Sequence, residues 1–177
     1  MNAAIFLDRD GVINQPIFRN GLNKPIAPWS MEEFKLYEGI EKPLQELADN
    51  KYYLFVVTNQ PDIAKGIIDS SLVEKMNEII MLTLPVVEIA YCPHGDHHGC
   101  NCRKPKPGMI LELAEKWNVK LKESFLIGDG WKDIKAGKSA GCKTILLDRN
   151  YNKGVSTDYH VKSLAEAVKI VKGGNAL

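Results

Sequence analysis

A short run of apolar residues near the start of the chain ends abruptly in two carboxylates and a glycine. The run covers residues 3–7, and Asp8, Arg9, Asp10 and Gly11 follow it. An unbroken apolar run of this length is typical of a strand that is buried on both faces, as in a parallel sheet. Ligands of such sheets bind beyond the carboxyl ends of the strands. The run therefore predicts both the class of the fold and the place of a site.

The two carboxylates stand two positions apart. We expect Asp8 and Asp10 to leave the strand tip in roughly the same direction while Arg9 turns away. Carboxylates this close repel each other unless a cation joins them, and a hard divalent ion is the natural partner. A polar turn with two solvated aspartates is the usual interpretation of an isolated Asp-x-Asp. The choice between a metal site and a solvated polar turn depends on the rest of the chain.

Strand-like and helix-like patterns alternate along all 177 residues, without repeats or low-complexity segments. This alternation predicts an α/β fold, a single Rossmann-like three-layer domain over residues 1–177 with a mostly parallel central sheet. The predicted strands are residues 3–7, 53–58, 86–91, 124–127 and 143–147. The predicted helices are residues 40–50, 70–82, 107–118, 131–140 and 163–172. Long aperiodic stretches in small domains tend to be functional, and this chain has two, 14–37 and 92–106.

Charge and hydropathy argue against two classes of partner. The chain has 23 Lys and Arg against 22 Asp and Glu, a net charge of +1, so no basic field favours nucleic acid or an anionic membrane surface. No apolar segment approaches the length of a membrane span, and Met1 and Asn2 lead directly into the first predicted strand. We expect a cytoplasmic protein, a monomer, with one active site.

Hydrogen-bonding residues also follow two other predicted strands. Thr58, Asn59 and Gln60 follow the second strand and offer a hydroxyl and two amides, which suit phosphate oxygens. Asp129 follows the fourth strand, where its carboxylate can reach the same metal ion as Asp8. The three strand tips together predict one polar site at the carboxyl edge of the sheet.

Further charged residues lie near these tips in the sequence. Asp133 follows Asp129 by four residues, where a helix begins, and can cap the turn or hold the loop. Arg103 and Lys104 can neutralise a bound phosphate and the aspartates around it. Lys106 is an alternative to Lys104 as the lysine that binds the phosphate and the aspartates. If its side chain is instead solvated, Lys106 has no role in the site.

The loop 92–102 holds a second group of candidate ligands. They are Cys92, His94, Cys100 and Cys102. Three thiolates and one imidazole can surround an ion tetrahedrally, which favours zinc, and they leave no position open for water. We therefore expect a structural site that pins this loop and holds the cations after it toward a substrate. Free thiols or a disulfide are alternatives, but the spacing of the last two cysteines is poor for pairing.

Two more histidines and one cysteine have open roles. His97 and His98 either replace His94 as a ligand, contact substrate, or are solvated. Cys142, which leads into a predicted strand, is expected to be a small buried hydrophobic residue.

With these residues in place, the chain resembles the haloacid dehalogenase-like phosphohydrolases, whose four motifs occur here in order over nearly the whole length. The matching residues are Asp8-x-Asp10-Gly11-Val12 for the first motif, Thr58 for the second, Lys104 for the third, and Gly128-Asp129 with Asp133 for the fourth.

The resemblance implies a role for each matched residue. Asp8 is the nucleophile that accepts the phosphoryl group, and Asp10 is the acid for the leaving alcohol and then the base for water. Mg²⁺ is held by Asp8, the main-chain carbonyl of Asp10, and Asp129. Thr58 and Lys104 stabilise the transferring group.

The loop 92–102, which is called the metal loop below, makes the resemblance more specific. Asp-Arg-Asp-Gly-Val-Ile-Asn, Thr-Asn-Gln, Cys-x-His…Cys-x-Cys and Cys-Arg-Lys-Pro-x-Pro-Gly-Met together resemble the D-glycero-D-manno-heptose 1,7-bisphosphate 7-phosphatases of lipopolysaccharide or capsule biosynthesis. Histidinol-phosphate phosphatases share much of this pattern. The resemblance implies hydrolysis of the 7-phosphate, no large cap domain, and pocket walls from residues 14–19 and 58–61. The implied substrate-binding residues are Arg9, Asn14, Arg19, Asn59, Gln60 and Arg103.

The chain departs from this family in three places, which bear on the substrate. The gap between His94 and Cys100 is shorter than in members of this family, and residues 15–19 differ from the corresponding family sequence. In the family a lysine frequently follows the residue that matches Asp129, whereas Gly130-Trp131 follow it here, so Lys132 is a candidate replacement for that lysine. The planar fork of Arg103 suits a second phosphate on a bisphosphate.

Three other functions stay open at this point. One is a histidinol-phosphate phosphatase. Another is a non-catalytic zinc module that binds a partner or nucleic acid, against which the lack of a basic stripe argues. The third is a phosphosugar sensor without turnover, against which Asp10 argues.

Overall fold

Six parallel strands form the sheet on which the rest of the molecule is built. The computed structural model describes residues 2–22 and 24–173, and the strands follow the order β3-β2-β1-β4-β5-β6. All hydrogen-bonded neighbours in this sheet run parallel. The strands are β1 (Ala4–Leu7), β2 (Tyr53–Asn59), β3 (Glu88–Cys92), β4 (Phe125–Gly128), β5 (Lys143–Leu147) and β6 (Tyr159–Val161).

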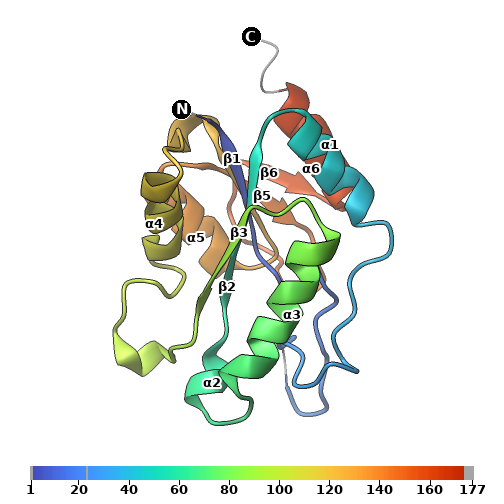
Figure 1. The fold of residues 1–177 in the computed structure, drawn as a ribbon, viewed down its shortest axis with the longest axis vertical. Helices are drawn as coiled ribbons and strands as arrows, with labels where there is room; N and C mark the ends of the chain where they lie inside the picture. The colour runs from blue at the N-terminus through green and yellow to red at the C-terminus, as the bar shows by residue number, and fades with distance from the viewer. Residues whose placement is uncertain (1, 23, 174–177) are drawn as a thin grey trace.

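Helices cover both faces of the sheet, which makes three layers (Figure 1). One face carries α1 (Glu41–Asp49), α3 (Ser70–Thr83) and α6 (Leu164–Gly173). The other carries α4 (Gly108–Lys116) and α5 (Trp131–Ala140). The connections contain α2 (Pro61–Ala64) and the short 3-10 turns η1 (Asp96–His98) and η2 (Leu121–Glu123). None of the helices in the described part of the chain is long and apolar enough to cross a membrane.

The first strand shows why its sequence is apolar without interruption. Ile5 and Leu7 belong to the core cluster that α1, α3 and α6 cover, and Ala4 and Phe6 belong to the cluster under α4 and α5. All four side chains are fully buried, so both faces of the strand contribute to the hydrophobic core.

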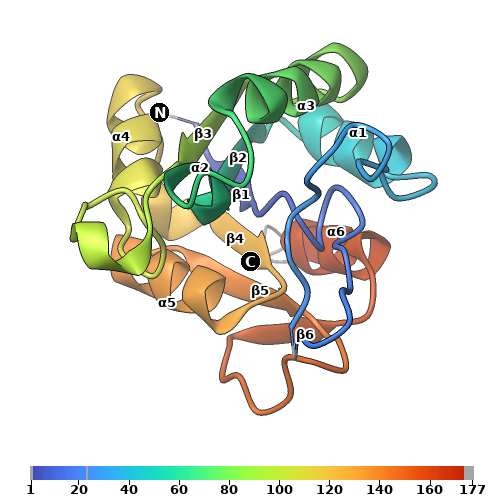
Figure 2. The ribbon, with the colours of Figure 1, turned by 90° about the horizontal axis from the view of Figure 1, so that it is seen from below.

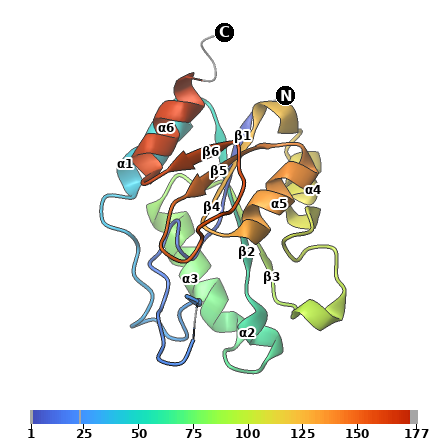
Figure 3. The ribbon, with the colours of Figure 1, turned by 180° about the vertical axis from the view of Figure 1, so that it is seen from behind.

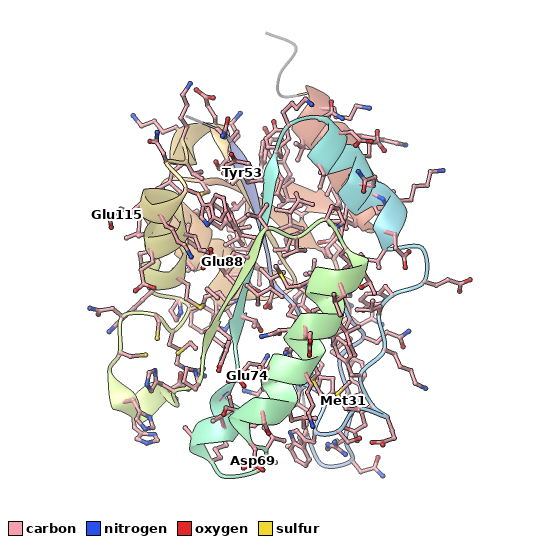
Figure 4. The ribbon with its side chains drawn as sticks, viewed as in Figure 1. Met31, Tyr53, Asp69, Glu74, Glu88 and Glu115 are labelled. Atoms are coloured by element: carbon pink, nitrogen blue, oxygen red, sulfur yellow. The ribbon has the colours of Figure 1, made fainter. Side chains whose placement is uncertain are left out.

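The edge strand β3 is tied to helices on both sides of the sheet. Glu88 accepts hydrogen bonds from Trp117 Nε1 (2.7 Å) and Lys116 Nζ (2.8 Å), and Tyr91 donates to Glu74 of α3 (3.1 Å). Figure 4 shows Glu88 on β3 and Glu74 on α3. Such side-chain cover protects an edge strand from pairing with another chain.

The α/β fold with a mostly parallel sheet is confirmed. Each predicted strand and helix is present, with its ends shifted by at most two residues. The sequence analysis missed β6 and α2. β6 has three residues of which two are exposed, and α2 has four residues, so neither contains enough sequence for a period to show.

The carboxyl ends of the strands face the same side of the molecule, which Figure 2 views directly. The segments 8–37, 92–106 and 148–158 surround this end. The two aperiodic stretches of the sequence therefore meet at the sheet edge where a parallel sheet binds its ligands.

Candidate active site

Three carboxylates converge at the ends of two adjacent strands. Asp8 follows β1, Asp129 follows β4, and Asp133 lies in the first turn of α5. Because β1 and β4 pair in parallel, with Leu7 opposite Ile127, their tips lie side by side. One carboxylate oxygen from each aspartate lies within 4.8 Å of the others.

Two glycines make room for this approach. A Cβ at Gly11, whose φ is +92°, would lie 1.9 Å from Oδ2 of Asp129, and a Cβ at Gly128 would lie 2.3 Å from Cβ of Asp133. Any side chain at either position would push a carboxylate out of the cluster.

Lys104, which closely follows the loop 92–102 in the chain, also reaches the carboxylate cluster. Its Nζ lies 2.9 Å from Oδ1 of Asp8 and 2.5 Å from Oδ1 of Asp133, and the side chain is 2% exposed. Asn59, at the end of β2, fixes the main chain of Lys104 through two hydrogen bonds, of 2.9 and 3.0 Å. Lys106 instead donates to the main-chain oxygens of Gly99 and Cys100, so Lys104 is the lysine that joins the carboxylates.

The cluster carries surplus negative charge. Burial and repulsion from Asp133 raise the pKa of Asp8 well above its usual value, and the same two causes raise the pKa of Asp129 to about 6. Burial alone would lower the pKa of Lys104, but attraction by Asp133 and Asp8 outweighs it, so this pKa is raised and the ammonium stays charged. Three carboxylates against one ammonium leave two negative charges. An all-oxygen donor set with that charge fits one Mg²⁺ ion.

Asp10 is held from behind by three buried side chains. Asn14 Nδ2 donates to Oδ1 (2.9 Å), Gln60 Nε2 donates to Oδ2 (2.8 Å), and Arg9 Nη2 lies 3.3 Å from both oxygens. Gln60 also donates to the Thr58 hydroxyl (2.9 Å). These contacts fix the carboxylate of Asp10, which lines a cavity of about 570 Å³ together with Asp8 and Thr58.

Arg9, Asn14 and Gln60, which the sequence predicts as substrate-binding residues, lie behind the cavity wall. Each is fully buried and none lines the cavity. The guanidinium of Arg9 reaches back to Asn77 of α3 (3.2 Å), because an i+1 residue points away from the strand tip that Asp8 and Asp10 share. In the structure all three contact the carboxylate of Asp10.

Arg19 also lies outside the cavity wall. Its Nη2 is 2.7 Å from both oxygens of Glu33, and its guanidinium stacks 4.0 Å above the ring of Trp29. Arg19 therefore holds the segment 14–37 together, and Pro16 and residues 24–27 of that segment line the cavity instead. Of the expected substrate-binding residues, the structure places Asn59 and Arg103 at the wall.

The segment between β5 and β6 supplies residues that sequence reasoning missed. Tyr151 donates a hydrogen bond to Oδ2 of Asp129, and Asn152 Nδ2 donates to the main-chain oxygen of Asp129 (2.9 Å). Figure 3 shows this segment descending from β5 on the side of the strand ends. It has neither periodicity nor a motif, so no signal in a single sequence marks it.

The four candidate zinc ligands come together as the sequence predicts. The sulfur atoms of Cys92, Cys100 and Cys102 lie 3.2–3.6 Å apart, and His94 Nδ1 lies 3.6 and 3.5 Å from the first and last of them. Ligands at tetrahedral corners around zinc, with Zn–S bonds of 2.3 Å, would be roughly 3.8 Å apart. The spacing is too long for a disulfide and close to that of a tetrahedral zinc site.

The two other histidines of the loop lie outside this cluster. His97 and His98 are exposed and their rings lie 4.0 Å apart, and His98 Nδ1 accepts a hydrogen bond from the Gly95 amide (3.1 Å). His94 is the imidazole that joins the thiols.

A substitution at Asp129 should change the stability of the metal-free protein and the stabilisation by Mg²⁺ in opposite directions. Asp129→Asn should raise the free energy of unfolding of the metal-free protein at pH 7 by on the order of 2 kcal/mol. A carboxyl whose pKa rises on folding binds more protons in the folded chain, so the parent protein loses stability as the pH rises from about 4 to about 6. The variant has no such penalty, and Mg²⁺ should no longer stabilise it. Urea denaturation at pH 5 and pH 7, with and without Mg²⁺, measures both effects.

The control for this experiment is Asp69→Asn, at an exposed carboxylate that makes no capping hydrogen bond at the start of α3. It should leave the pH dependence and the Mg²⁺ effect as in the parent. An Asp129→Asn protein that is less stable than the parent at pH 7 without metal would contradict the charge argument.

Comparisons with known proteins agree with this geometry. A family model described as HAD-hydrolase-like matches residues 101–168. The D-glycero-beta-D-manno-heptose-1,7-bisphosphate 7-phosphatase of Pasteurella multocida is 34% identical over 190 residues, which cover 98% of each chain. The D-glycero-alpha-D-manno-heptose-1,7-bisphosphate 7-phosphatase of Campylobacter jejuni is 33% identical over 96% of this chain and 95% of its own.

A solved structure shows the same fold. The D,D-heptose 1,7-bisphosphate phosphatase of B. bronchiseptica, complexed with magnesium and phosphate, superposes with a TM-score of 0.81 at 27% identity, over 97% of this chain and 99% of the other. The fold and the sequence motifs therefore agree with those of the two relatives above 30% identity. The chain belongs to the haloacid dehalogenase-like hydrolases, in the family of the D-glycero-D-manno-heptose-1,7-bisphosphate 7-phosphatases.

Proposed function

We propose that this chain is a Mg²⁺-dependent phosphatase that removes the 7-phosphate of D-glycero-D-manno-heptose 1,7-bisphosphate through an aspartyl phosphate on Asp8. The observation that carries the proposal is the arrangement of Asp8 and Asp10 on one cavity wall, the first held by Lys104 and the second by buried donors. The similar proteins of Pasteurella multocida, Campylobacter jejuni and B. bronchiseptica are phosphatases of heptose 1,7-bisphosphates, which supports the choice of substrate.

The contacts of Asp8 assign its two oxygens. Oδ1 accepts from Lys104 Nζ (2.9 Å) and from the Arg9 amide (2.8 Å), which leaves Oδ2 for the attack on phosphorus. As the new bond forms, the bond between phosphorus and the C7 oxygen breaks, and Asp10 gives its proton to that oxygen. Asp10 then takes a proton from water, the water oxygen bonds to phosphorus, and the bond to Asp8 breaks, which releases inorganic phosphate.

The other residues of the wall stabilise charge. The Thr58 hydroxyl and the Lys104 ammonium can bind phosphoryl oxygens as negative charge develops on them. Asp8, Asp129 and the main-chain carbonyl of Asp10 would hold Mg²⁺, which offsets the repulsion between these carboxylates and the incoming phosphate.

We also propose that Cys92, His94, Cys100 and Cys102 bind a structural zinc ion. The support is the mutual approach of the four donor atoms and their soft, closed donor set. Arg103 and Lys104 follow the last ligand directly in the chain, so an ordered loop fixes both cations at the cavity.

Competing substrates test the proposed function. We expect kcat/KM for the heptose 1,7-bisphosphates to exceed that for histidinol phosphate by about 10-fold or more, because Arg103 can form two hydrogen bonds with a second phosphate. Phosphate release with both anomers and with histidinol phosphate measures this, since the similar proteins include enzymes named for either anomer. A higher kcat/KM for histidinol phosphate than for both bisphosphates would overturn the choice of substrate.

A further inference from the structure

The metal loop places a carboxylate between two cations of the cavity wall. Asp96, in η1, accepts a hydrogen bond at Oδ1 from Arg103 Nε (2.7 Å), and Lys132 Nζ lies 3.2 Å from the same oxygen. The side chain of Asp96 is 76% exposed, whereas those of Arg103 and Lys132 are 12% and 31% exposed. The carboxylate is therefore the most solvent-accessible of the three groups, and less buried contact has to be given up when it moves than when Arg103 moves.

The arginine has unused capacity to bind an anion. Arg103 and Lys132 both line the cavity, whereas Asp96 does not. Nη1 of Arg103 is buried and has no hydrogen-bond partner among the described residues. A buried guanidinium nitrogen without an acceptor is unfavourable, so this donor remains available for an added acceptor.

We propose that Asp96 is a tethered competitor for the anion subsite of Arg103 and Lys132, and that the phosphate that is not hydrolysed displaces it when the substrate binds. The inference rests on the proposed function for the identity of that phosphate. A phosphate dianion offers more charge and more acceptor oxygens than a carboxylate, so it replaces Asp96 on both cations. A ligand with a single phosphate, bound at Asp8, leaves Asp96 in place.

This arrangement makes Asp96 a specificity-determining residue. In the free enzyme its carboxylate contacts both Arg103 and Lys132 and offsets one of their two positive charges, which lowers their attraction for inorganic anions. The displacement raises the KM of the bisphosphate, and it leaves the KM of a monophosphate unchanged. Substituting Asp96 should therefore act on one class of ligand only.

The experiment compares Asp96→Asn with the parent on two substrates. We expect the KM of heptose 1,7-bisphosphate to fall about 2- to 5-fold, the range of an exposed ion pair, and the KM of p-nitrophenyl phosphate to stay the same. The matched control is Asp69→Asn, which removes an exposed carboxylate far from Arg103 in the chain and should change neither value. An unchanged or higher KM for the bisphosphate, or an equal change for both substrates, would overturn the proposal.

A second variant tests whether the effect runs through the named cations. In a Lys132→Met background, Asp96→Asn should give a smaller fall in KM, because one of the two cations that Asp96 blocks is gone. A fall of the same size in both backgrounds would contradict the role of Lys132.

A readout without the bisphosphate separates this inference from the proposed function. Mannose 1-phosphate, whose phosphate we expect at Arg103 and Lys132 with its sugar in front of Asp8, should inhibit p-nitrophenyl phosphate hydrolysis about 2- to 5-fold more strongly in Asp96→Asn than in the parent. If the bisphosphate is not hydrolysed, but mannose 1-phosphate inhibits Asp96→Asn more strongly than it inhibits the parent, the proposed function is wrong and the anion subsite is supported. If the inhibition does not strengthen, the subsite is wrong whatever the substrate.

Discussion

Asp8→Asn should reduce kcat by about 10⁴-fold or more, because an amide cannot form the aspartyl phosphate on which both half-reactions depend. The fold should persist. The side chain keeps its shape, and loss of one charge from a cluster with three carboxylates and one ammonium relieves repulsion that raises the pKa of Asp8 in the parent. Steady-state phosphate release and thermal denaturation measure the two outcomes on the same preparation.

The matched control for this variant is Asp10→Asn. It should also lose turnover, since the proposed mechanism gives both proton transfers to Asp10, but the phosphoryl group can still reach Asp8 when the leaving group needs no proton. With p-nitrophenyl phosphate, Asp10→Asn should therefore release a burst of p-nitrophenol as the aspartyl phosphate forms, whereas Asp8→Asn should release none. An Asp8→Asn protein with undiminished Mg²⁺-dependent turnover would exclude Asp8 as the nucleophile.

Loss of one of the four proposed zinc ligands should have the second largest effect. Cys102→Ser should lower kcat/KM by about 100-fold, because Arg103 and Lys104 follow this ligand and a displacement of about 1 Å is enough for such a loss. The variant should also hold less metal and unfold at a lower temperature, since binding of a structural metal contributes directly to folding.

Metal analysis and activity on the same sample test this expectation. The parent should contain about one zinc per chain, and less than about half an equivalent would count against a closed four-ligand site. Cys142→Ala is the control, because Cys142 is a buried thiol outside the cluster and should keep both zinc and activity. If Cys102→Ser lost its metal and kept full activity, the loop would not position the cations.

The polar strand tips were predictable because a parallel sheet leaves few alternatives. Once β1, β2 and β4 are strands, their carboxyl ends must meet at one edge, and Asp8, Thr58 and Asp129 are the polar residues that lie there. The approach of Cys92, His94, Cys100 and Cys102 was predictable for a similar reason, since the four residues lie within one short loop.

The positions of the residues around Asp10 were harder to predict. The alternation of a strand correctly turns Arg9 away from the cavity, but it does not predict that Arg9 is fully buried and that its guanidinium contacts Asp10 and Asn77. Asn14 and Gln60 are polar loop residues whose burial depends on how segments far apart in the chain pack together. Tyr151 and the pairing of Asp96 with Lys132 depend on the same long-range packing, and no local pattern encodes it.

Phosphorus NMR of the reaction with heptose 1,7-bisphosphate, run with the parent and with Asp8→Asn side by side, tests the central claim most directly. The account predicts that the parent converts the C7 phosphate signal into inorganic phosphate in the presence of Mg²⁺ and leaves the C1 phosphate signal intact, while Asp8→Asn changes neither. Release of the C1 phosphate, or equal release by the two proteins, would contradict it.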